Sequence, residues 1–155
     1  MSYADTDPPP LDITLAHPAR SLDEAALARL LQHVADAEGF ALRSLGVVLA
    51  DHETVHRLNR EFLDHDYVTD VLSFSLDEDA AAEGIVDGEV YVDLDTAAER
   101  APEFGATFEE EAFRYVVHGL LHLMGYDDAT DDERAAMRAL EDRYLAEAGD
   151  RGDDE

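Results

Sequence analysis

The segment HGLLHLMGYDD, residues 118–128, predicts a helix that ends in a sharp turn. His118 and His122 are four residues apart, so on a helix their imidazole rings lie on one face, one turn apart. Gly125 can adopt the left-handed conformation that ends a helix, and the chain can then turn back and bring Asp128 beneath the two rings. Two neutral nitrogens and one carboxylate oxygen, with a fourth position open, are typical of a catalytic zinc site rather than a structural one. We therefore predict that His118, His122 and Asp128 hold one metal ion.

The same residues also have structural interpretations. Two histidines on an apolar helix can be core residues, and Asp128 can cap the next helix, although Thr130 is placed to do so. Metzincin peptidases share the spacing in the pattern H-E-x-x-H-x-x-G-x-x-H, where the Glu after the first His acts as general base. Gly119 occupies that position here and cannot accept a proton, so the sequence argues against a peptidase.

The composition is strongly acidic. Among 155 residues there are 38 acidic and 11 basic ones, which gives a formal net charge of -27, and 46% of the chain is hydrophobic. This length and hydrophobic content favour one folded domain. Negative charges repel one another less at high salt, because the Debye length falls to about 3 Å at 1 M. We interpret the composition as halophilic, an adaptation to a salty cytoplasm; the simpler alternative is a solvated acidic surface with no binding role.

Several classes of protein are excluded by the same composition. The chain has no cysteine, so disulfides and thiolate metal sites are impossible. There is no apolar run long enough to span a membrane, and the N-terminus lacks the basic and apolar regions of a signal peptide. We therefore expect a cytoplasmic protein without a membrane partner. The negative charge argues against a broad surface for polyanions but leaves room for a small basic site.

Hydrophobic periodicity and capping residues divide the chain into about four strands and about five helices. The predicted strands are 11–15, 45–50, 68–74 and 88–94. The predicted helices begin near Ser21, His52, Asp95, Thr107 and Thr130, and the last one ends near Ala148. Because two-residue hairpin signals are scarce, we expect an α/β (α+β) fold, a single domain with helices packed on a sheet. The terminal segments 1–10 and 149–155 should be disordered.

Several motifs together resemble one family. Residues 118–128 resemble the motif H-G-x-L-H-L-x-G-Y-D-H of the YbeY family of ribosomal RNA maturation endoribonucleases, and ten of its eleven positions hold. Residues 58–59 and 69–74 resemble the family's L-N-x(9)-T-[DN]-V-L-S-F. Residues 88–92 (GEVYV) resemble G-D-I-x-I, and 94–97 match the family's L-D-T-A. The order and spacing of these motifs agree over most of the chain.

This resemblance implies a mixed four-stranded sheet with helices, one zinc ion at the helix motif, and residues 11–148 as a single metal-dependent hydrolase domain. It also implies an endonuclease that cleaves single-stranded RNA, with a role in 16S rRNA 3′-end maturation, ribosome biogenesis and ribosome quality control. The implied partners are the rRNA precursor, the small ribosomal subunit and its assembly factors. The attacking oxygen is either a water or the RNA's own 2′-hydroxyl, and the sequence does not choose between them.

Two positions depart from the family pattern. Asp128 replaces the family's third His; carboxylate is an accepted zinc ligand, but the more anionic site could shift preference toward Mn²⁺ or Fe²⁺. Leu63 replaces an Arg that the family uses in substrate handling. We hypothesise that Arg60, one helical turn earlier, makes the phosphate contact instead. The alternative is a surface arginine paired with Glu61 or Asp64.

Two further residues join Arg60 as candidates for catalysis. Asp70 could hold the second ring nitrogen of a metal ligand, or could face solvent on an edge strand. His65 could donate a proton or contact phosphate, or could be a solvated loop histidine. Competing functions are a non-enzymatic metal-binding ribosome assembly factor and, ranked lower, a zincin-like metallopeptidase. An iron oxygenase ranks last, because its two-His-one-carboxylate ligands usually come from strands of a β-barrel.

Overall fold

Four strands of the described residues form one sheet. The computed structural model describes residues 10–62 and 70–153. The strands are β1 (Leu11–Ala16), β2 (Ala41–Ala50), β3 (Val71–Ser75) and β4 (Ile85–Asp93), in the order β1-β2-β4-β3. β1, β2 and β4 are parallel to one another, whereas β3 pairs antiparallel with β4 at one edge. The sheet is mixed, and the prediction of a single α/β domain is confirmed.

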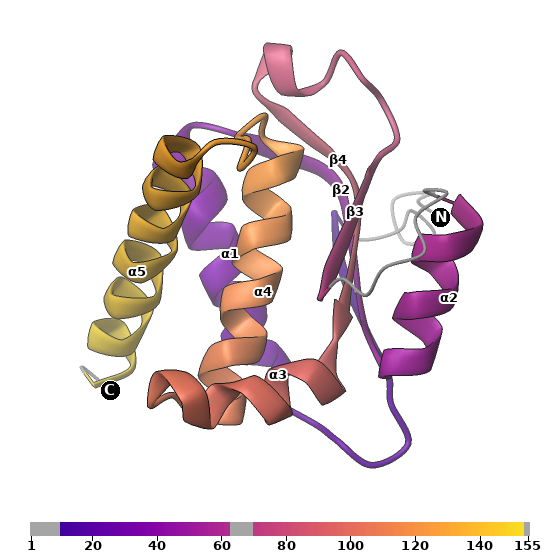
Figure 1. Ribbon diagram of the computed structural model, residues 1–155. Coiled ribbons are helices and arrows are strands. Elements are labelled where there is room, and N and C mark those ends of the chain that lie inside the picture. Colours follow the sequence, from indigo (N-terminus) through magenta and orange to yellow (C-terminus); the bar gives the residue numbers. More distant parts are fainter. Residues whose placement is uncertain (1–9, 63–69, 154–155) are drawn as a thin grey trace, which may run out of the picture.

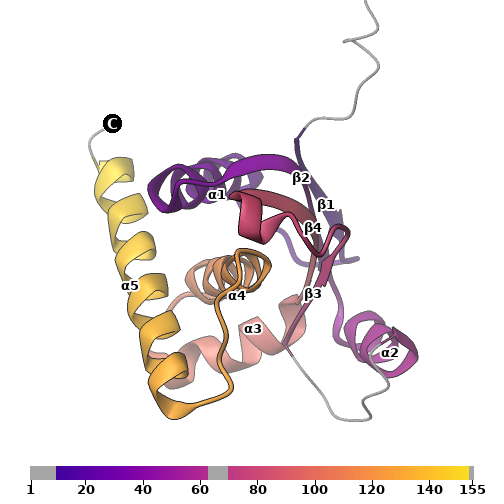
Figure 2. The same ribbon diagram turned by 90° about the horizontal axis from the view of Figure 1, so that it is seen from above.

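The helices lie unequally on the two faces of the sheet. They are α1 (Glu24–Glu38), α2 (His52–Phe62), α3 (Leu94–Arg100), α4 (Phe108–Leu123) and α5 (Asp131–Asp153), with 3₁₀ turns η2 (Ala81–Glu83) and η3 (Ala101–Phe104). Viewed along the sheet, α1, α3, α4 and α5 lie on one side and α2 on the other (Figures 1 and 2). In the described part of the chain, no helix combines the length and apolar character needed to cross a membrane.

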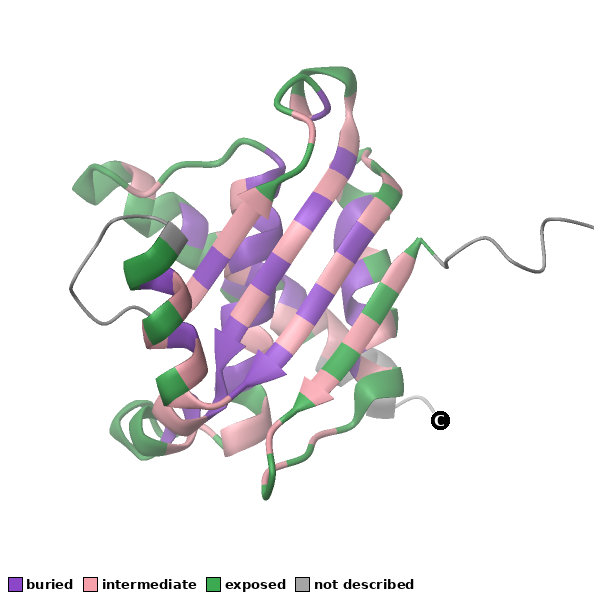
Figure 3. Ribbon diagram, turned by 90° about the vertical axis from the view of Figure 1, so that its right-hand side faces the viewer, coloured by how far each residue is buried: buried purple, intermediate pink, exposed green. Residues whose placement is uncertain are grey.

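The main core lies between the sheet and the larger helical layer. Leu30 of α1, Leu121 of α4 and Tyr144 of α5 are buried there against Val47 and Val90 of the two central strands. On the opposite face, a smaller cluster joins Ala50, Val55 and Leu72 under α2. Figure 3 shows this second face, on which buried and partly exposed residues alternate along β2 and β4. Alternate side chains of a strand point to opposite faces, so the deeply buried ones mark the face toward α1 and α4.

Helix caps decide where several elements begin. The predicted capping boxes at Thr107 and Thr130 are present. Each Thr hydroxyl accepts a hydrogen bond from the backbone N–H of the Glu three residues later, and the carboxylate of that Glu accepts one from the backbone N–H of the Thr. The prediction that Ser21 opens α1 is wrong, because Asp23 accepts from the backbone N–H of Ala26 instead. Likewise α3 begins after Asp93, earlier than expected, because the Asp93 carboxylate caps it.

The two terminal segments were both expected to be disordered tails. The last helix continues past Ala148 to Asp153, so its backbone enters the segment expected to be a disordered tail. Of the expected N-terminal tail, residues 1–9 lie outside the described part, and the carbonyl of Pro10 accepts a hydrogen bond from the backbone N–H of Leu45.

Candidate metal centre

Helix α4 lies directly on the sheet because it carries a glycine at the point of contact. A Cβ atom at Gly119 would lie 2.5 Å from Cγ1 of Val90 on β4 and 3.1 Å from Cγ1 of Val71 on β3. No side chain fits at those distances, so Gly119 is required for the close approach of helix and sheet. The residue that argued against a peptidase base thus also has a packing role. This contact fixes the position of α4, and with it that of the neighbouring His118, relative to the sheet.

The turn after α4 brings the third predicted ligand beneath the two histidines. Gly125 has φ of +104°, as predicted for the residue that ends the helix. The backbone N–H of Tyr126 bonds to the carbonyl of Leu121 and that of Gly125 to the carbonyl of His122, the two hydrogen bonds of a Schellman motif. The chain reverses there, and Asp128 returns toward the last turn of α4.

The three predicted ligand atoms lie close together. The Nε2 atoms of His118 and His122 are 3.1 Å apart, and Oδ2 of Asp128 is 3.3 Å from the first and 3.4 Å from the second. Ligand atoms about 2.0–2.1 Å from a tetrahedral zinc ion lie roughly 3.3 Å from each other. The spacing of this donor set therefore fits one small divalent cation.

The outer ring nitrogens of both histidines are already engaged. Nδ1 of His118 lies 2.7 Å from Oε2 of Glu141, and Nδ1 of His122 lies 3.1 Å from the carbonyl oxygen of Tyr126. Each acceptor requires a proton on Nδ1, so each Nε2 presents a lone pair to the other. Two lone pairs facing each other repel unless a proton or a metal cation lies between them. The hydrogen-bond pattern is therefore compatible with a cation bound at the three donors.

Glu141 and Arg114 form a relay from α5 to His118. Glu141 is buried, with 4% exposure, and its other oxygen accepts from Nη1 of Arg114 at 3.1 Å. Arg114 also donates through Nη2 to Asp142 at 2.6 Å. Burial lowers the pKa of His118, but the hydrogen bond to Glu141 and the charges of Glu141 and Asp128 outweigh it, so the pKa is raised from its ordinary value.

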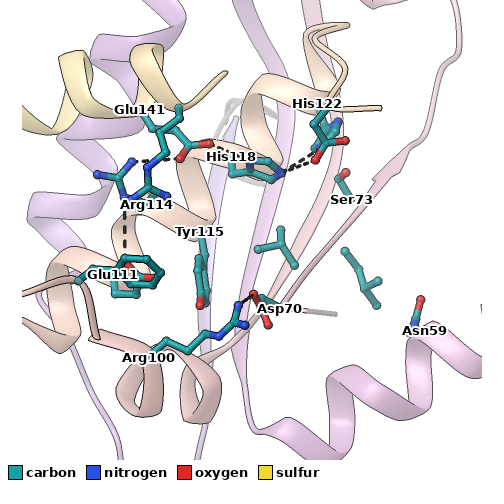
Figure 4. Close-up of a pocket in the computed structure, with 15 residues that line it drawn as sticks. Asn59, Asp70, Ser73, Arg100, Glu111, Arg114, Tyr115, His118, His122 and Glu141 are labelled. Atoms are coloured by element: carbon teal, nitrogen blue, oxygen red, sulfur yellow. Dashed lines mark hydrogen bonds and ion pairs between the residues drawn. The ribbon is translucent and has the colours of Figure 1, made fainter. Parts of the chain in front are cut away.

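A pocket of about 550 Å³ opens in front of the three donors. Figure 4 shows His118, His122 and Tyr115 along one side of it, on α4, with Asp70 and Ser73 from the β3 side. The α4 residues Glu111, Tyr115, His118 and His122 recur at helical spacing and all line the pocket. The donor triad is therefore open to a ligand in this pocket rather than sealed in the core.

The predicted catalytic residues have different outcomes. Asp70 lines the pocket, and its carboxylate pairs with Arg100 at 3.2 Å; the residue beside the outer nitrogen of His118 is Glu141, and a catalytic role of Asp70 stays a prediction. Burial raises the pKa of Asp70. Arg60 is an exposed residue in the last turn of α2 and is not among the described pocket residues. His65 lies outside the described residues.

One signal in the sequence could have identified Glu141. Buried apolar residues of α5 include Met137 and Tyr144, and Glu141 falls four residues after the first and three before the second. A carboxylate on the buried stripe of a helix needs a partner, because an unpaired buried charge is very costly. The identity of that partner, a histidine 23 positions earlier, depends on how α5 docks on α4.

Comparison with known proteins agrees with this geometry. The model of the family described as Endoribonuclease YbeY matches residues 13–149. The protein named Endoribonuclease YbeY from Salinibacter ruber is 60% identical over 144 residues, covering 89% of this chain and 91% of its own. Its namesake from Chlorobaculum tepidum is 44% identical, covering 81% and 89% respectively.

A solved structure supports the same assignment at the level of the fold. The solution structure of TM1509 from Thermotoga maritima superposes with a TM-score of 0.63 at 30% identity, covering 93% of this chain and 92% of the other. The family model spans most of the chain, and its relatives share both length and sequence with it. The chain belongs to the YbeY endoribonuclease family.

Proposed function

We propose that this protein is a metal-dependent endoribonuclease that hydrolyses phosphodiester bonds of single-stranded RNA. The observation that carries the proposal is the donor triad of His118, His122 and Asp128, open to a pocket in a chain of the Endoribonuclease YbeY family. These three residues would hold one Zn²⁺, with Mn²⁺ or Fe²⁺ as alternatives because the carboxylate makes the set harder. When bound, such an ion supplies a Lewis acid that polarises a phosphoryl oxygen.

The chain's own residues prepare the donors for this role. Glu141 and the carbonyl of Tyr126 hold the protons on the outer nitrogens, so both inner nitrogens stay available without a change of tautomer. Arg114 fixes the Glu141 carboxylate in turn, which limits the rotation of the His118 ring. The pocket wall formed by β3 gives an RNA strand room to approach the triad from one side.

The biological setting follows from the family. We infer that the RNA is an rRNA precursor, that cleavage contributes to maturation of the 16S rRNA 3′ end and to ribosome quality control, and that the small ribosomal subunit and its assembly factors are partners. Such a role would locate the protein in the cytoplasm. The net charge of -27 supports a cytoplasm of high ionic strength, where screening permits an acidic protein to approach RNA.

A paired measurement of metal content and RNA cleavage tests the proposed function. Wild type and Asp128→Ala are loaded with zinc or manganese and assayed on a single-stranded RNA in molar potassium chloride. We expect Asp128→Ala to lose both metal and cleavage, and Asp127→Ala, the exposed neighbouring carboxylate, to keep both. A wild type that holds metal yet leaves RNA intact would favour the assembly factor instead. Hydrolysis of casein without cleavage of RNA would favour the metallopeptidase.

The role of Arg60 is tested against a neighbour on the same helix. Arg60 and Arg57 are both exposed on α2 and neither has a carboxylate within 4.0 Å among the described residues. If Arg60 contacts the RNA phosphate, Arg60→Ala lowers cleavage at unchanged metal content, whereas Arg57→Ala leaves cleavage near the wild-type rate. Equal activity of all three proteins would remove the hypothesis. His65 stays a prediction for a proton donor or phosphate contact, to be tested in the same assay with His65→Ala.

A further inference from the structure

The pocket continues beyond the donor triad to a second group of side chains. Its lining also includes Arg100 of α3, Phe104 of η3 and Arg138 of α5. We propose that Phe104 and Arg138 form a stacking subsite for one RNA base next to the cleaved bond, with Arg100 contacting the adjoining phosphate. The proposal rests on the proposed endoribonuclease function and goes further, because it names the residues that would bind the substrate beside the metal.

Phe104 is placed to receive a flat ligand. Its side chain is at the end of η3 and is 54% exposed, although large apolar side chains are costly to expose. The guanidinium carbon of Arg138, on α5, lies 5.3 Å from the centre of the Phe104 ring. Aromatic rings and guanidinium planes are the surfaces on which unpaired bases stack in single-stranded RNA complexes. The two residues offer both surfaces at one pocket wall.

Arg138 has no carboxylate partner among the described residues, although the chain is strongly acidic. Most arginines of the described residues have a carboxylate within 4.0 Å, but Arg138 has none there. The other described arginines without such a partner, Arg29, Arg57 and Arg60, do not line the pocket. With 38 acidic residues in the chain, a cation held over a ring rather than beside an acid is available to an incoming ligand.

Two further polar groups of the pocket lining are suited to a phosphate. Arg100 donates to Asp70 through Nη1 and interacts with the hydroxyl of Tyr115, and its guanidinium has five N–H donors in all, so donors remain for a ligand. The hydroxyl of Tyr115 is buried at the pocket wall beside Arg100 and Asp70, without a hydrogen bond of normal geometry to either. Figure 4 shows Tyr115 between His118 and the Arg100–Asp70 pair. Tyr115 precedes His118 by three residues, roughly 4.5 Å along the helix axis.

Charge favours stacking as the main source of affinity. Four carboxylates line the pocket, Asp70, Glu111, Asp128 and Glu141, against three arginines, so even with a divalent cation at the triad the lining would offer a phosphate only a small net positive charge. High salt weakens phosphate contacts further. Base stacking does not depend on net charge in this way. A strongly acidic nuclease therefore gains from an apolar, aromatic contact with its substrate.

The experiment combines variants of the protein with modified RNAs, so that each loss can be compared alone and together. The cleavage site of wild type is first mapped on a defined single-stranded RNA; abasic ribonucleotides are then introduced one at a time on either side of it. We expect one position at which the abasic RNA raises KM by about five- to a hundredfold with wild type, the range found when stacking aromatics are replaced. Phe104→Ala should raise KM for intact RNA similarly and be insensitive to that abasic position, while Phe104→Trp restores the difference.

Matched controls separate the subsite from general effects. Leu76→Ala removes another exposed apolar side chain, and Arg29→Ala another unpaired arginine, both outside the pocket; KM should stay at the wild-type value in each. Metal content should be unchanged in every variant. If Phe104→Ala and Arg138→Ala keep the full abasic effect at all positions, the subsite is refuted while the nuclease stands.

Failure of the proposed function gives a different result. If wild type does not cleave RNA, fluorescence anisotropy with the same intact and abasic RNAs tests the subsite by affinity alone. Loss of affinity on Phe104→Ala, absent with the abasic RNA, would support base stacking by a non-catalytic RNA-binding protein. No measurable RNA binding by wild type would overturn the subsite together with the nuclease.

Discussion

A single carboxylate, Glu141, determines which ring nitrogen His118 presents to the site. Its oxygen fixes the proton of His118 on the outer nitrogen, and the Arg114 guanidinium prevents the carboxylate from turning away. Hydrogen bonds of this kind to a metal-binding histidine raise its basicity and hold its ring in orientation. The affinity of the site for a cation therefore depends on a residue that does not touch the cation.

Replacing Glu141 tests this dependence. Glu141→Gln keeps the size of the side chain but removes its charge, so we expect affinity for zinc to fall by roughly 10- to 100-fold. Asp142→Asn is the control, because it weakens the other contact of Arg114 and leaves the bond to His118 in place. Competition with a chromophoric chelator measures the dissociation constants. Equal zinc affinities for Glu141→Gln and wild type would contradict the positioning role.

Residues within one helix and its turn could be predicted; residues that meet through the fold could not. The proximity of His118, His122 and Asp128 could be predicted because helical geometry and one glycine define their placement locally. Glu141 was missed because it comes from a different helix, and the pairing of Asp70 with Arg100 was missed because the two lie 30 residues apart. The sequence places Glu141 on the buried stripe of α5 but does not show which residue either carboxylate contacts.

At the scale of elements, the short distance between α4 and the sheet depends on Gly119. Alanine normally favours a helix over glycine by about 1 kcal/mol. Here the added methyl would collide with Val90, and overpacking of this kind costs about 1–3 kcal/mol. The helix gain offsets part of this cost, so we expect Gly119→Ala to lower the free energy of unfolding by up to about 2 kcal/mol. We also expect it to lower zinc affinity, since α4 must move.

A second glycine provides the comparison. At Gly46 on β2 an added methyl would meet only Glu89, at 3.6 Å, which is an ordinary contact. Urea unfolding of Gly46→Ala should therefore give a free energy equal to or above that of wild type. If Gly119→Ala proved as stable as Gly46→Ala, the proposed close contact between α4 and the sheet would be wrong.

Element boundaries were predicted where a side chain marks them and were missed where pairing decides them. Thr107 and Thr130 carry the capping signal in their own sequence. In contrast β2 begins at Ala41, four residues before the predicted start, because Ala41 pairs with Ile85 of β4 across a shift in register. Residues 41–44 alternate weakly in hydrophobicity, so only the partner strand shows that they are extended.

For the whole molecule, the dominant physical quantity is the net charge of -27. Repulsion among these charges opposes the compact state, and added salt screens it. We expect the midpoint of thermal unfolding to rise continuously as potassium chloride increases from about 0.05 M toward about 1 M, the range over which the Debye length falls steeply. Circular dichroism of the metal-loaded protein measures the midpoint.

Sucrose serves as the control for this prediction. It is excluded from protein surfaces without screening charge, so it separates general stabilisation from electrostatics. A midpoint that is independent of potassium chloride, or that falls with it, would show that the charges are already balanced in the folded protein. The acidic composition would then be a solvated surface without a link to salt.

The hydrogen bond from His118 to Glu141 of α5 also bears on when the metal site is completed during translation. All three proposed ligands precede residue 129, whereas Glu141 and the anchoring residues of α5 are translated after them. An unfinished polypeptide can therefore collect the donors but not the carboxylate that aligns them. We therefore expect full metal affinity only once α5 has been translated and has docked on α4.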